Sequence, residues 1–95
     1  MAVRSGIKTV TTAGTRVQLS STWAQCTEVA LTALQANTGV IAIGDNNVVA
    51  LAGSERGMTI NAAQTEYVHN INLSSIYIDS TVNGEGVSWV ATSEM

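Results

Sequence analysis

The segment Ile76–Ala91, with the sequence IYIDSTVNGEGVSWVA, decides the fold class of this chain. Apolar and polar side chains alternate over residues 76–79 and again over 87–89, which is the pattern of a half-buried β-strand. Asn83-Gly84 lies between the two runs and is the dipeptide most typical of a tight hairpin turn. The sequence therefore predicts a C-terminal hairpin, with Tyr77 and Trp89 packing across its two strands.

The rest of the chain continues this pattern, because valine, isoleucine and threonine recur throughout and favour pleated strands over helices. Turns are predicted at Ala13-Gly14, between two strands, and at Asp45-Asn46-Asn47. Further strands are predicted over residues 7–12, 15–19, 40–44, 48–51, 58–60 and 67–69.

Residues 26–34 allow two interpretations. Alternation of Val29, Leu31 and Ala33 with other residues indicates a strand. A helix over 27–36 would suit its alanine and leucine content and would end at Asn37-Thr38-Gly39. We favour the strand, because the β-rich segment 39–44 follows at once and would complete a hairpin.

These elements predict an all-β fold, namely a small antiparallel β-sandwich or jelly-roll-like domain of about seven or eight short strands and less than about a tenth of helix. A chain of 95 residues fits one domain. We assign residues 1–6 to an N-terminal arm and residues 7–95 to the sandwich. The arm or one end of the sandwich is the expected attachment point, because termini and loops carry function on β scaffolds.

The composition indicates a weakly charged surface. Charged residues make up 12% of the chain, hydrophobic residues make up 45%, and the formal net charge is −3. Four scattered cations cannot form the basic stripe that binds phosphates, so we expect no nucleic-acid partner. Such a surface suits a protein embedded in an assembly.

The single cysteine, Cys26, cannot close an intramolecular disulfide, and we expect it to be buried as a small apolar side chain. One histidine without a second cysteine gives no structural zinc site. Without these reinforcements a short chain gains most from self-association, so we expect a homo-oligomer, with a trimer as the favoured state.

No membrane partner is expected. The first residues, Met1 to Gly6, lack the apolar core of a secretory signal, and no apolar stretch is long enough to cross a bilayer. We therefore expect the protein to stay in the cytosol or to leave it by a route other than a cleaved signal, such as release of an assembled particle by lysis.

The sequence offers weak candidates for catalysis or metal binding. His69 is the only imidazole, and Ser74 and Ser75 lie in no nucleophile elbow. Asp45, Asp79 and Glu85 fall in predicted turns without the spacing of a calcium loop, which favours a turn role. We predict no catalytic, cofactor-binding or metal-binding residues.

Aromatic residues are the better candidates for partner contact. Trp23 lies in the polar loop Ser20–Ala24, and Tyr67 lies in a short strand-like run. Exposed rings can serve as a stacking platform for a carbohydrate or as an anchor for a protein. We therefore predict Trp23 and Tyr67 as possible contact residues.

Five segments resemble a small β-domain found in virion proteins of tailed bacteriophages. Residues 17–20, 26–29 and 37–44 resemble its start, and the last of these contains a Gly-x-Ile-x-Ile-Gly strand at 39–44. The Asn-Leu-Ser-x-Ile-Tyr-Ile-Asp segment at 72–79 and the Gly-Glu-x-Val-Ser segment at 84–88 resemble its end. The resemblance extends from about Thr9 to Val90. It departs from the pattern over 51–66, where a proline-free Ala62–Glu66 replaces the Leu-x-Pro-Gly-Glu turn.

The resemblance implies a capsid decoration or cement protein, or a head-fibre protein, and carries no catalytic positions. We expect copies to bind the major capsid protein of a phage on the outer surface and to stabilise the head by bridging capsid subunits. The alternative is a tail- or fibre-associated module that binds a receptor or glycan. An enzyme fragment completed by a partner chain is a third possibility.

Overall fold

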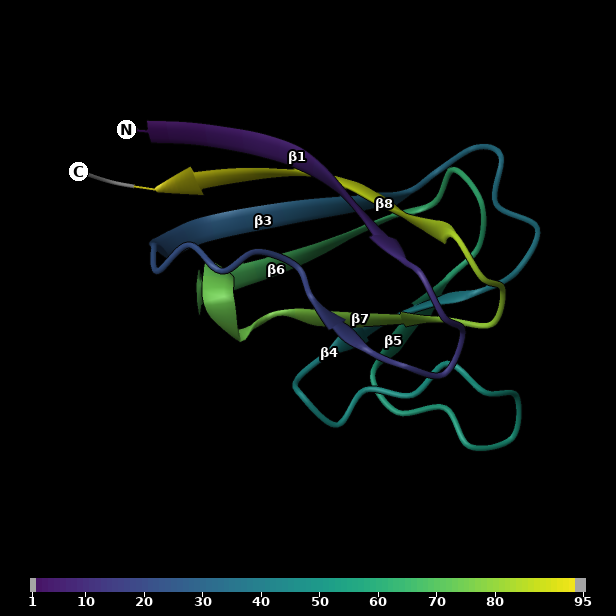
Figure 1. Cartoon of the computed structure of the whole chain (residues 1–95). Helices are drawn as coiled ribbons and strands as arrows, with labels where there is room; N and C mark the ends of the chain where they lie inside the picture. Colours follow the sequence, from purple (N-terminus) through teal and green to yellow (C-terminus); the bar gives the residue numbers. More distant parts are fainter. Residues whose placement is uncertain (1, 94–95) are drawn as a thin grey trace.

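The computed structural model describes residues 2–93, which form two four-stranded antiparallel sheets packed face to face (Figure 1). The elements are β1 (Ala2–Val10), β2 (Val17–Gln18), β3 (Gln25–Ala33), β4 (Ile41–Gly44), β5 (Met58–Ile60), β6 (Thr65–Asn72), the 3₁₀-helix η1 (Leu73–Ser75), β7 (Tyr77–Ser80) and β8 (Glu85–Ser93). The predicted all-β sandwich with little helix is confirmed.

The strand order is that of a jelly roll. The first sheet, here called sheet A, has the order β1-β8-β3-β6, and the second, sheet B, has the order β2-β7-β4-β5. Strands that follow one another in the chain therefore alternate between sheets over most of the domain, as in the paired Greek keys of this architecture.

The predicted C-terminal hairpin is wrong. β8 pairs with β1 and β3, whereas β7 pairs with β2 and β4, so Tyr77 and Trp89 lie in different sheets. The turn itself exists: Gly84 has φ +80°, and its N–H donates to the Val10 carbonyl over 2.7 Å. A local turn signal fixes where the chain reverses and leaves open which strands then pair.

The hairpin predicted from residues 26–34 and 39–44 is wrong for the same reason, because β3 and β4 lie in different sheets. The Ala13-Gly14 turn likewise leads from β1 in one sheet to β2 in the other. The strand interpretation of residues 26–34 is confirmed, because β3 buries Val29, Leu31 and Ala33 on one face. The partners of β3 are β6 and β8, both distant in sequence.

Residues 2–6 do not form an arm. They make up the first half of β1, which pairs with β8 from Ala2 opposite Ser93 to Val10 opposite Glu85; Met1 lies outside the described residues. Two further boundaries differ. β6 is longer than the predicted run 67–69, and residues 48–51 form only a single bridge, between Val49 and Arg56.

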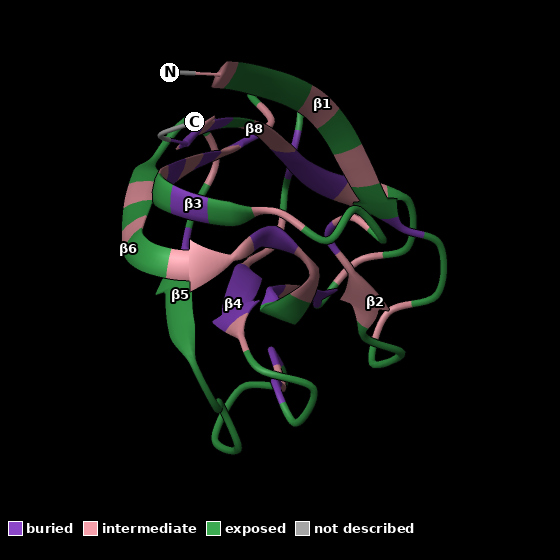
Figure 2. Cartoon of the chain, turned by 90° about the vertical axis from the view of Figure 1, so that its left-hand side faces the viewer, coloured by how far each residue is buried: buried purple, intermediate pink, exposed green. Residues whose placement is uncertain are grey.

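The core lies between the sheets and follows the alternation of the strands, visible as buried bands in Figure 2. Cys26 is buried as predicted. Within residues 2–93 no helix is long and apolar enough to span a membrane. The large core side chains are Val10, Leu19, Val29, Leu31, Ile41, Ile43, Ile60, Leu73, Ile76, Ile78 and Val87.

Candidate binding surface

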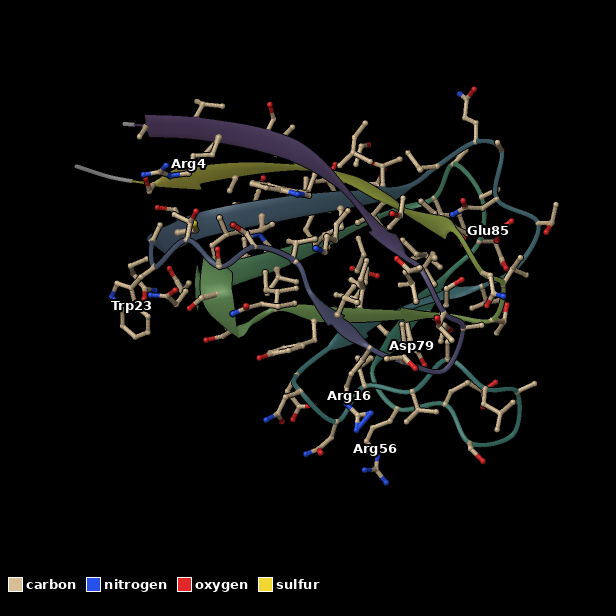
Figure 3. The ribbon with its side chains drawn as sticks, viewed as in Figure 1. Arg4, Arg16, Trp23, Arg56, Asp79 and Glu85 are labelled. Atoms are coloured by element: carbon tan, nitrogen blue, oxygen red, sulfur yellow. The ribbon has the colours of Figure 1, made fainter. Side chains whose placement is uncertain are left out.

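Trp23 is the most exposed large apolar side chain of those described, at 83%. It projects from the loop between β2 and β3 at one end of the sandwich (Figure 3). The next residue anchors this loop: the Ala24 N–H donates to the Asn72 side chain over 3.3 Å, and the Ala24 carbonyl accepts from the Leu73 N–H over 2.8 Å. The indole is therefore presented on a fixed backbone.

Tyr67 lies elsewhere, in the middle of β6 and opposite Ala30 of β3. The Trp23 loop adjoins the far end of β6, since it is anchored to Asn72. Asn72 lies five residues beyond Tyr67 in β6, which spans at most about 16 Å because Asn70 has a left-handed φ of +52°. The two predicted contact residues are exposed, but the fold does not bring them into one groove.

The outer face of sheet A gathers a second set of exposed apolar side chains. Cross-strand pairing places Ser5, Val90, Ala30 and Tyr67 in one row across all four strands. On β1, Val3 and Ile7 flank Ser5 two residues away on either side, and Ile7 is 69% exposed. We call the resulting patch the apolar face; its members are Val3, Ile7, Ala30, Tyr67 and Val90.

Small side chains hollow the centre of the apolar face. A shallow depression of about 430 Å³ lies between Ile7 and Val90, with Ser5, Ala30 and Ser88 among the residues that line it. Contiguous exposed apolar surface of this kind marks interaction sites in soluble proteins. An apolar side chain from a partner would fit between the two walls.

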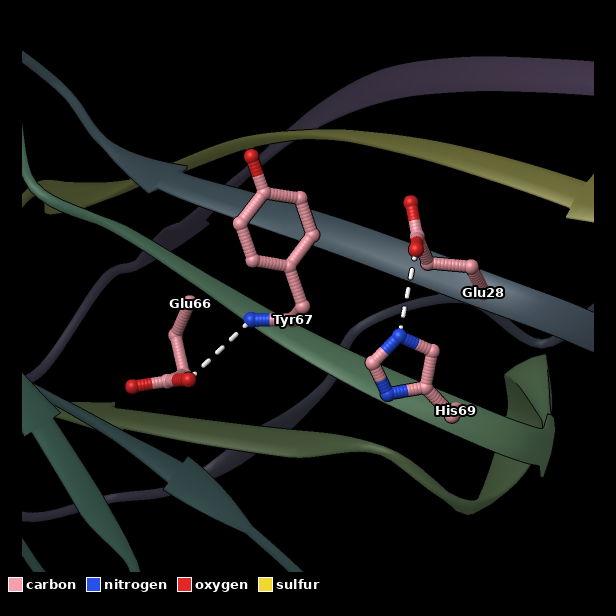
Figure 4. A network of polar contacts seen from close by, with 4 residues as sticks. All are labelled: Glu28, Glu66, Tyr67 and His69. Atoms are coloured by element: carbon pink, nitrogen blue, oxygen red, sulfur yellow. Dashed lines mark hydrogen bonds and ion pairs between the residues drawn. The ribbon is translucent and has the colours of Figure 1, made fainter.

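The charged groups at the margin of this face are Glu28 and His69. The His69 Nε2 and a Glu28 carboxylate oxygen are 3.1 Å apart, and both side chains are exposed to solvent (Figure 4). A contact between two exposed groups of this kind contributes at most about 1 kcal/mol. Apart from Glu28 and His69, the residues that share the outer face of the four paired strands are uncharged. His69 is thus a residue of the outer face, paired with a neighbouring strand.

Asp79 has a role that the sequence did not predict. It lies within β7 rather than in a turn and is 1% exposed (Figure 3). Its Oδ1 accepts from the N–H groups of Gly14 and Ser80 over 3.1 and 2.8 Å, and its Oδ2 accepts from the Ala50 N–H over 3.0 Å. The carboxylate therefore ties two distant loops to sheet B.

Glu85 begins β8 and holds the loop between β3 and β4. Its Oε2 accepts from the Thr38 N–H and hydroxyl over 2.6 and 3.0 Å, and its Oε1 accepts from the Gly39 N–H over 2.9 Å. The Thr38 N–H contributes most to holding the pKa of Glu85 below its ordinary value of 4.5, aided by the other two donors and opposed by desolvation.

A lowered folded-state pKa gives a pH dependence of known sign. The unfolded chain binds a proton at Glu85 more readily, so this side chain stabilises the fold above pH 4.5 and loses that contribution as the pH falls through the lower folded-state pKa. Glu85→Gln is expected to lower the free energy of unfolding at pH 7, and the difference from wild type should shrink as the pH falls below 4.5. Urea titrations across this range measure it.

The matched control is Glu55→Gln, which removes the same charge from an exposed loop where the carboxylate accepts only from the Gly53 N–H. The lowered pKa of Glu85 would be contradicted if the free energies of unfolding of wild type and Glu85→Gln differed by the same amount from neutral to acidic pH.

Within the described part of the chain, no group of three or more His, Cys, Asp and Glu side chains is placed to hold a metal ion. Sequence reasoning missed Val3, Ile7 and Val90 as surface candidates. One feature of the sequence could have identified Val90 as a surface candidate, because β8 carries apolar residues on both faces. Val87 is fully buried, whereas Val90 faces outward. An apolar residue at an outward position indicates contact surface.

Neither the family models, nor the curated proteins, nor the solved structures compared with this chain gave a match.

Proposed function

We propose that this protein is a bacteriophage capsid decoration protein, which docks on the outer capsid surface and bridges neighbouring major capsid subunits. The observation that carries the proposal is the apolar face: an exposed, nearly neutral surface built on the four strands of sheet A. The resemblance of residues 39–44, 72–79 and 84–88 to phage virion domains supports the same assignment.

The size of this face suits attachment to a protein lattice. Four strands about 4.8 Å apart and nine residues of about 3.3 Å each give roughly 570 Å² per copy. Counting both partners, a fully covered face reaches the roughly 1,000 Å² of buried area that specific interfaces exceed. Adding such contacts across a subunit boundary opposes the outward pressure of packaged DNA.

A homo-oligomer, with a trimer favoured, is part of this proposal. Several linked faces bind a repeating lattice more tightly than one, because the second contact forms at high effective concentration. Localisation on the capsid surface follows from the proposed function.

The alternative function, a tail- or fibre-associated glycan-binding module, has Trp23 in its favour. A sugar platform commonly needs more than one ring or a groove, and Tyr67 lies up to about 16 Å from the strand end that anchors the Trp23 loop. The geometry therefore supports the capsid proposal better. If the Trp23→Ala variant occupies capsid shells like wild type but no longer binds a glycan, the glycan-binding function would be favoured.

Heat release of DNA from particles tests the capsid proposal. Particles that lack the protein should assemble but release DNA at a lower temperature than decorated particles, because a ligand that prefers the intact shell stabilises it by mass action. Equal release temperatures for bare and decorated shells would reject the cement mechanism.

Val90→Glu locates the docking surface. Val90 lies at the centre of the apolar face, and a carboxylate buried there without a partner costs about 2 kcal/mol or more, which lowers shell affinity about thirtyfold or more. Co-sedimentation with purified shells measures this affinity.

Leu51→Glu is the control for Val90→Glu, because it adds the same charge at an exposed leucine in the loop after β4. It should bind shells like wild type. Equal affinities for Val90→Glu and wild type would exclude the apolar face as the capsid contact.

A further inference from the structure

The two sheets differ in the length of their open edges. Sheet B ends in β2 and β5, which have two and three residues, whereas sheet A ends in β1 and β6, which have nine and eight. Short edge strands are one way in which soluble proteins avoid edge-to-edge association. Sheet A presents two long edges in one molecule (Figure 1).

Hydrogen bonding shows which backbone groups face these edges. The Tyr67 N–H donates to the carboxylate of its neighbour Glu66 over 3.2 Å, a contact drawn in Figure 4. This N–H therefore points away from β3. The Glu66 carboxylate accepts the hydrogen bond that a backbone carbonyl of an adjoining strand would otherwise accept. Since successive residues of a strand point their backbone groups to alternate sides, Thr65 and His69 share this orientation.

The same alternation of backbone N–H and C=O directions determines which groups of β1 face its open edge. In β3, the Ala33 N–H donates toward the β6 side, to the Gln64 carbonyl, and the Leu34 N–H donates toward the β8 side, to the Gly86 carbonyl. The even-numbered residues of β8 therefore point their backbone groups toward β3, and its odd-numbered residues point theirs toward β1. These odd-numbered residues pair with the even-numbered residues of β1, so the backbone groups of the odd-numbered residues of β1 face the open edge. These residues are Val3, Ser5, Ile7 and Thr9.

The two edges are complementary in direction and in side chains. β1 and β6 run in opposite directions in the sheet, so β1 of a second copy beside β6 continues the antiparallel order. Setting Lys8 opposite Glu66 pairs opposite charges and places Ile7 opposite Tyr67. It also places Thr9 opposite Thr65 and Ser5 opposite His69. Opposite charges, aromatic with β-branched residues, and threonine pairs are favourable cross-strand pairs.

We propose that copies of this chain assemble by pairing the β6 edge of one copy with the β1 edge of the next, with Lys8 opposite Glu66. A joint between two β1 strands in full overlap is disfavoured, because it sets Arg4 against Lys8 of the second copy. In the proposed joint, Ile7 and Tyr67 meet on the outer surface and extend the apolar face from one copy to the next.

The joint is heterologous, so it closes into a ring or continues as a filament. Right-handed twist curves the combined sheet, and a three-membered ring would supply the trimer of the proposed function. The joint itself does not require capsid attachment.

Charge reversal tests the joint. Lys8→Glu and Glu66→Lys each place like charges opposite each other, and each should raise the dissociation constant about two- to thirtyfold. The double variant Lys8→Glu/Glu66→Lys should restore assembly. Light scattering over a concentration series gives the oligomeric state, and circular dichroism verifies that each variant is folded. Arg4→Glu is the control, because Arg4 falls opposite Asn70 and should change assembly little.

A wild-type monomer at about 100 μM would overturn the proposal, as would folded single variants that assemble like wild type. Folded single variants whose double combination remains monomeric would overturn the register. Shell co-sedimentation of the same variants is scored separately, so failure of self-assembly is distinguishable from failure of capsid binding.

A disulfide provides an independent test. Lys8 and Glu66 of one molecule are three strand spacings apart, about 14 Å, which is too far for a bond within the chain. Across the proposed joint their Cα atoms would lie about 5 Å apart, within disulfide range. Lys8→Cys/Glu66→Cys should give covalent oligomers on a non-reducing gel, and Arg4→Cys/Glu66→Cys should give none. The reverse pattern would reject the register.

Discussion

Asp79→Asn is expected to lower the free energy of unfolding by about 2–4 kcal/mol, because it leaves at least one buried N–H without an acceptor. The wild-type carboxylate accepts from Gly14 and Ser80 through Oδ1 and from Ala50 through Oδ2. An amide keeps one oxygen, so its NH₂ group must face either the Ala50 N–H or the other two donors. No orientation satisfies all three.

The size of this effect follows from burial. Asp79 is 1% exposed, so water cannot replace the lost acceptor. In a domain of this size 1 kcal/mol shifts the melting temperature by about 4–8 °C, so a loss of about 2–4 kcal/mol predicts a decrease of roughly 8–32 °C. Calorimetry or thermal circular dichroism measures the decrease.

Asp45→Asn is the matched control for Asp79→Asn, since it removes the same charge. Asp45 lies in an exposed turn, where its Oδ1 accepts only from the Asn47 N–H over 2.9 Å. An asparagine oxygen makes the same contact, so the change should stay within about 0.5 kcal/mol. Similar melting temperatures for the two variants would refute the role assigned to Asp79.

Gly86→Ala is expected to destabilise the fold by about 3 kcal/mol, at the upper end of the range for overpacking a rigid site. A Cβ at this position would overlap the Lys8 carbonyl oxygen and lie 2.6 Å from the Thr9 Cα. Both are backbone atoms of β1, so no side chain can rotate away. The Gly86 carbonyl also accepts from the Asn37 side chain over 2.8 Å and from the Leu34 N–H over 3.1 Å, which fixes the strand from the opposite side.

Gly14→Ala separates this steric effect from the general effect of replacing glycine. Gly14 has φ +85° and no atom within 4 Å of an added Cβ, so only backbone strain of about 1–2 kcal/mol is expected. Chemical denaturation of both variants measures the difference. If Gly86→Ala is no less stable than Gly14→Ala, β1 and β8 do not approach as closely as described.

Pairing partners were the part of the fold that local patterns could not predict. Asn83-Gly84 and Ala13-Gly14 were recognised as turns, and Asn83-Gly84 was assigned to a hairpin. Each turn leads the chain from one sheet to the other. A turn sequence reports only backbone dihedral preferences, whereas strand pairing is decided by which apolar faces can be buried together.

The candidate surface was predictable only in part. Trp23, in a polar loop, and Tyr67, in a short strand-like run, were predicted as possible contact residues, and both are exposed. The apolar face could not be derived, because Ile7, Val90 and Ala30 come from strands far apart in the sequence. Their adjacency depends on the register of β8 between β1 and β3.

The sequence by itself determined the all-β class, the extended state of residues 25–33 and the burial of Cys26, because alternation and β-branching act within a few residues. Tertiary structure alone decided the jelly-roll order, the buried acceptor role of Asp79 and the exposure of the β1 and β6 edges. These features depend on contacts between segments tens of residues apart. Such contacts are selected by packing the whole core and leave no local signal in the chain.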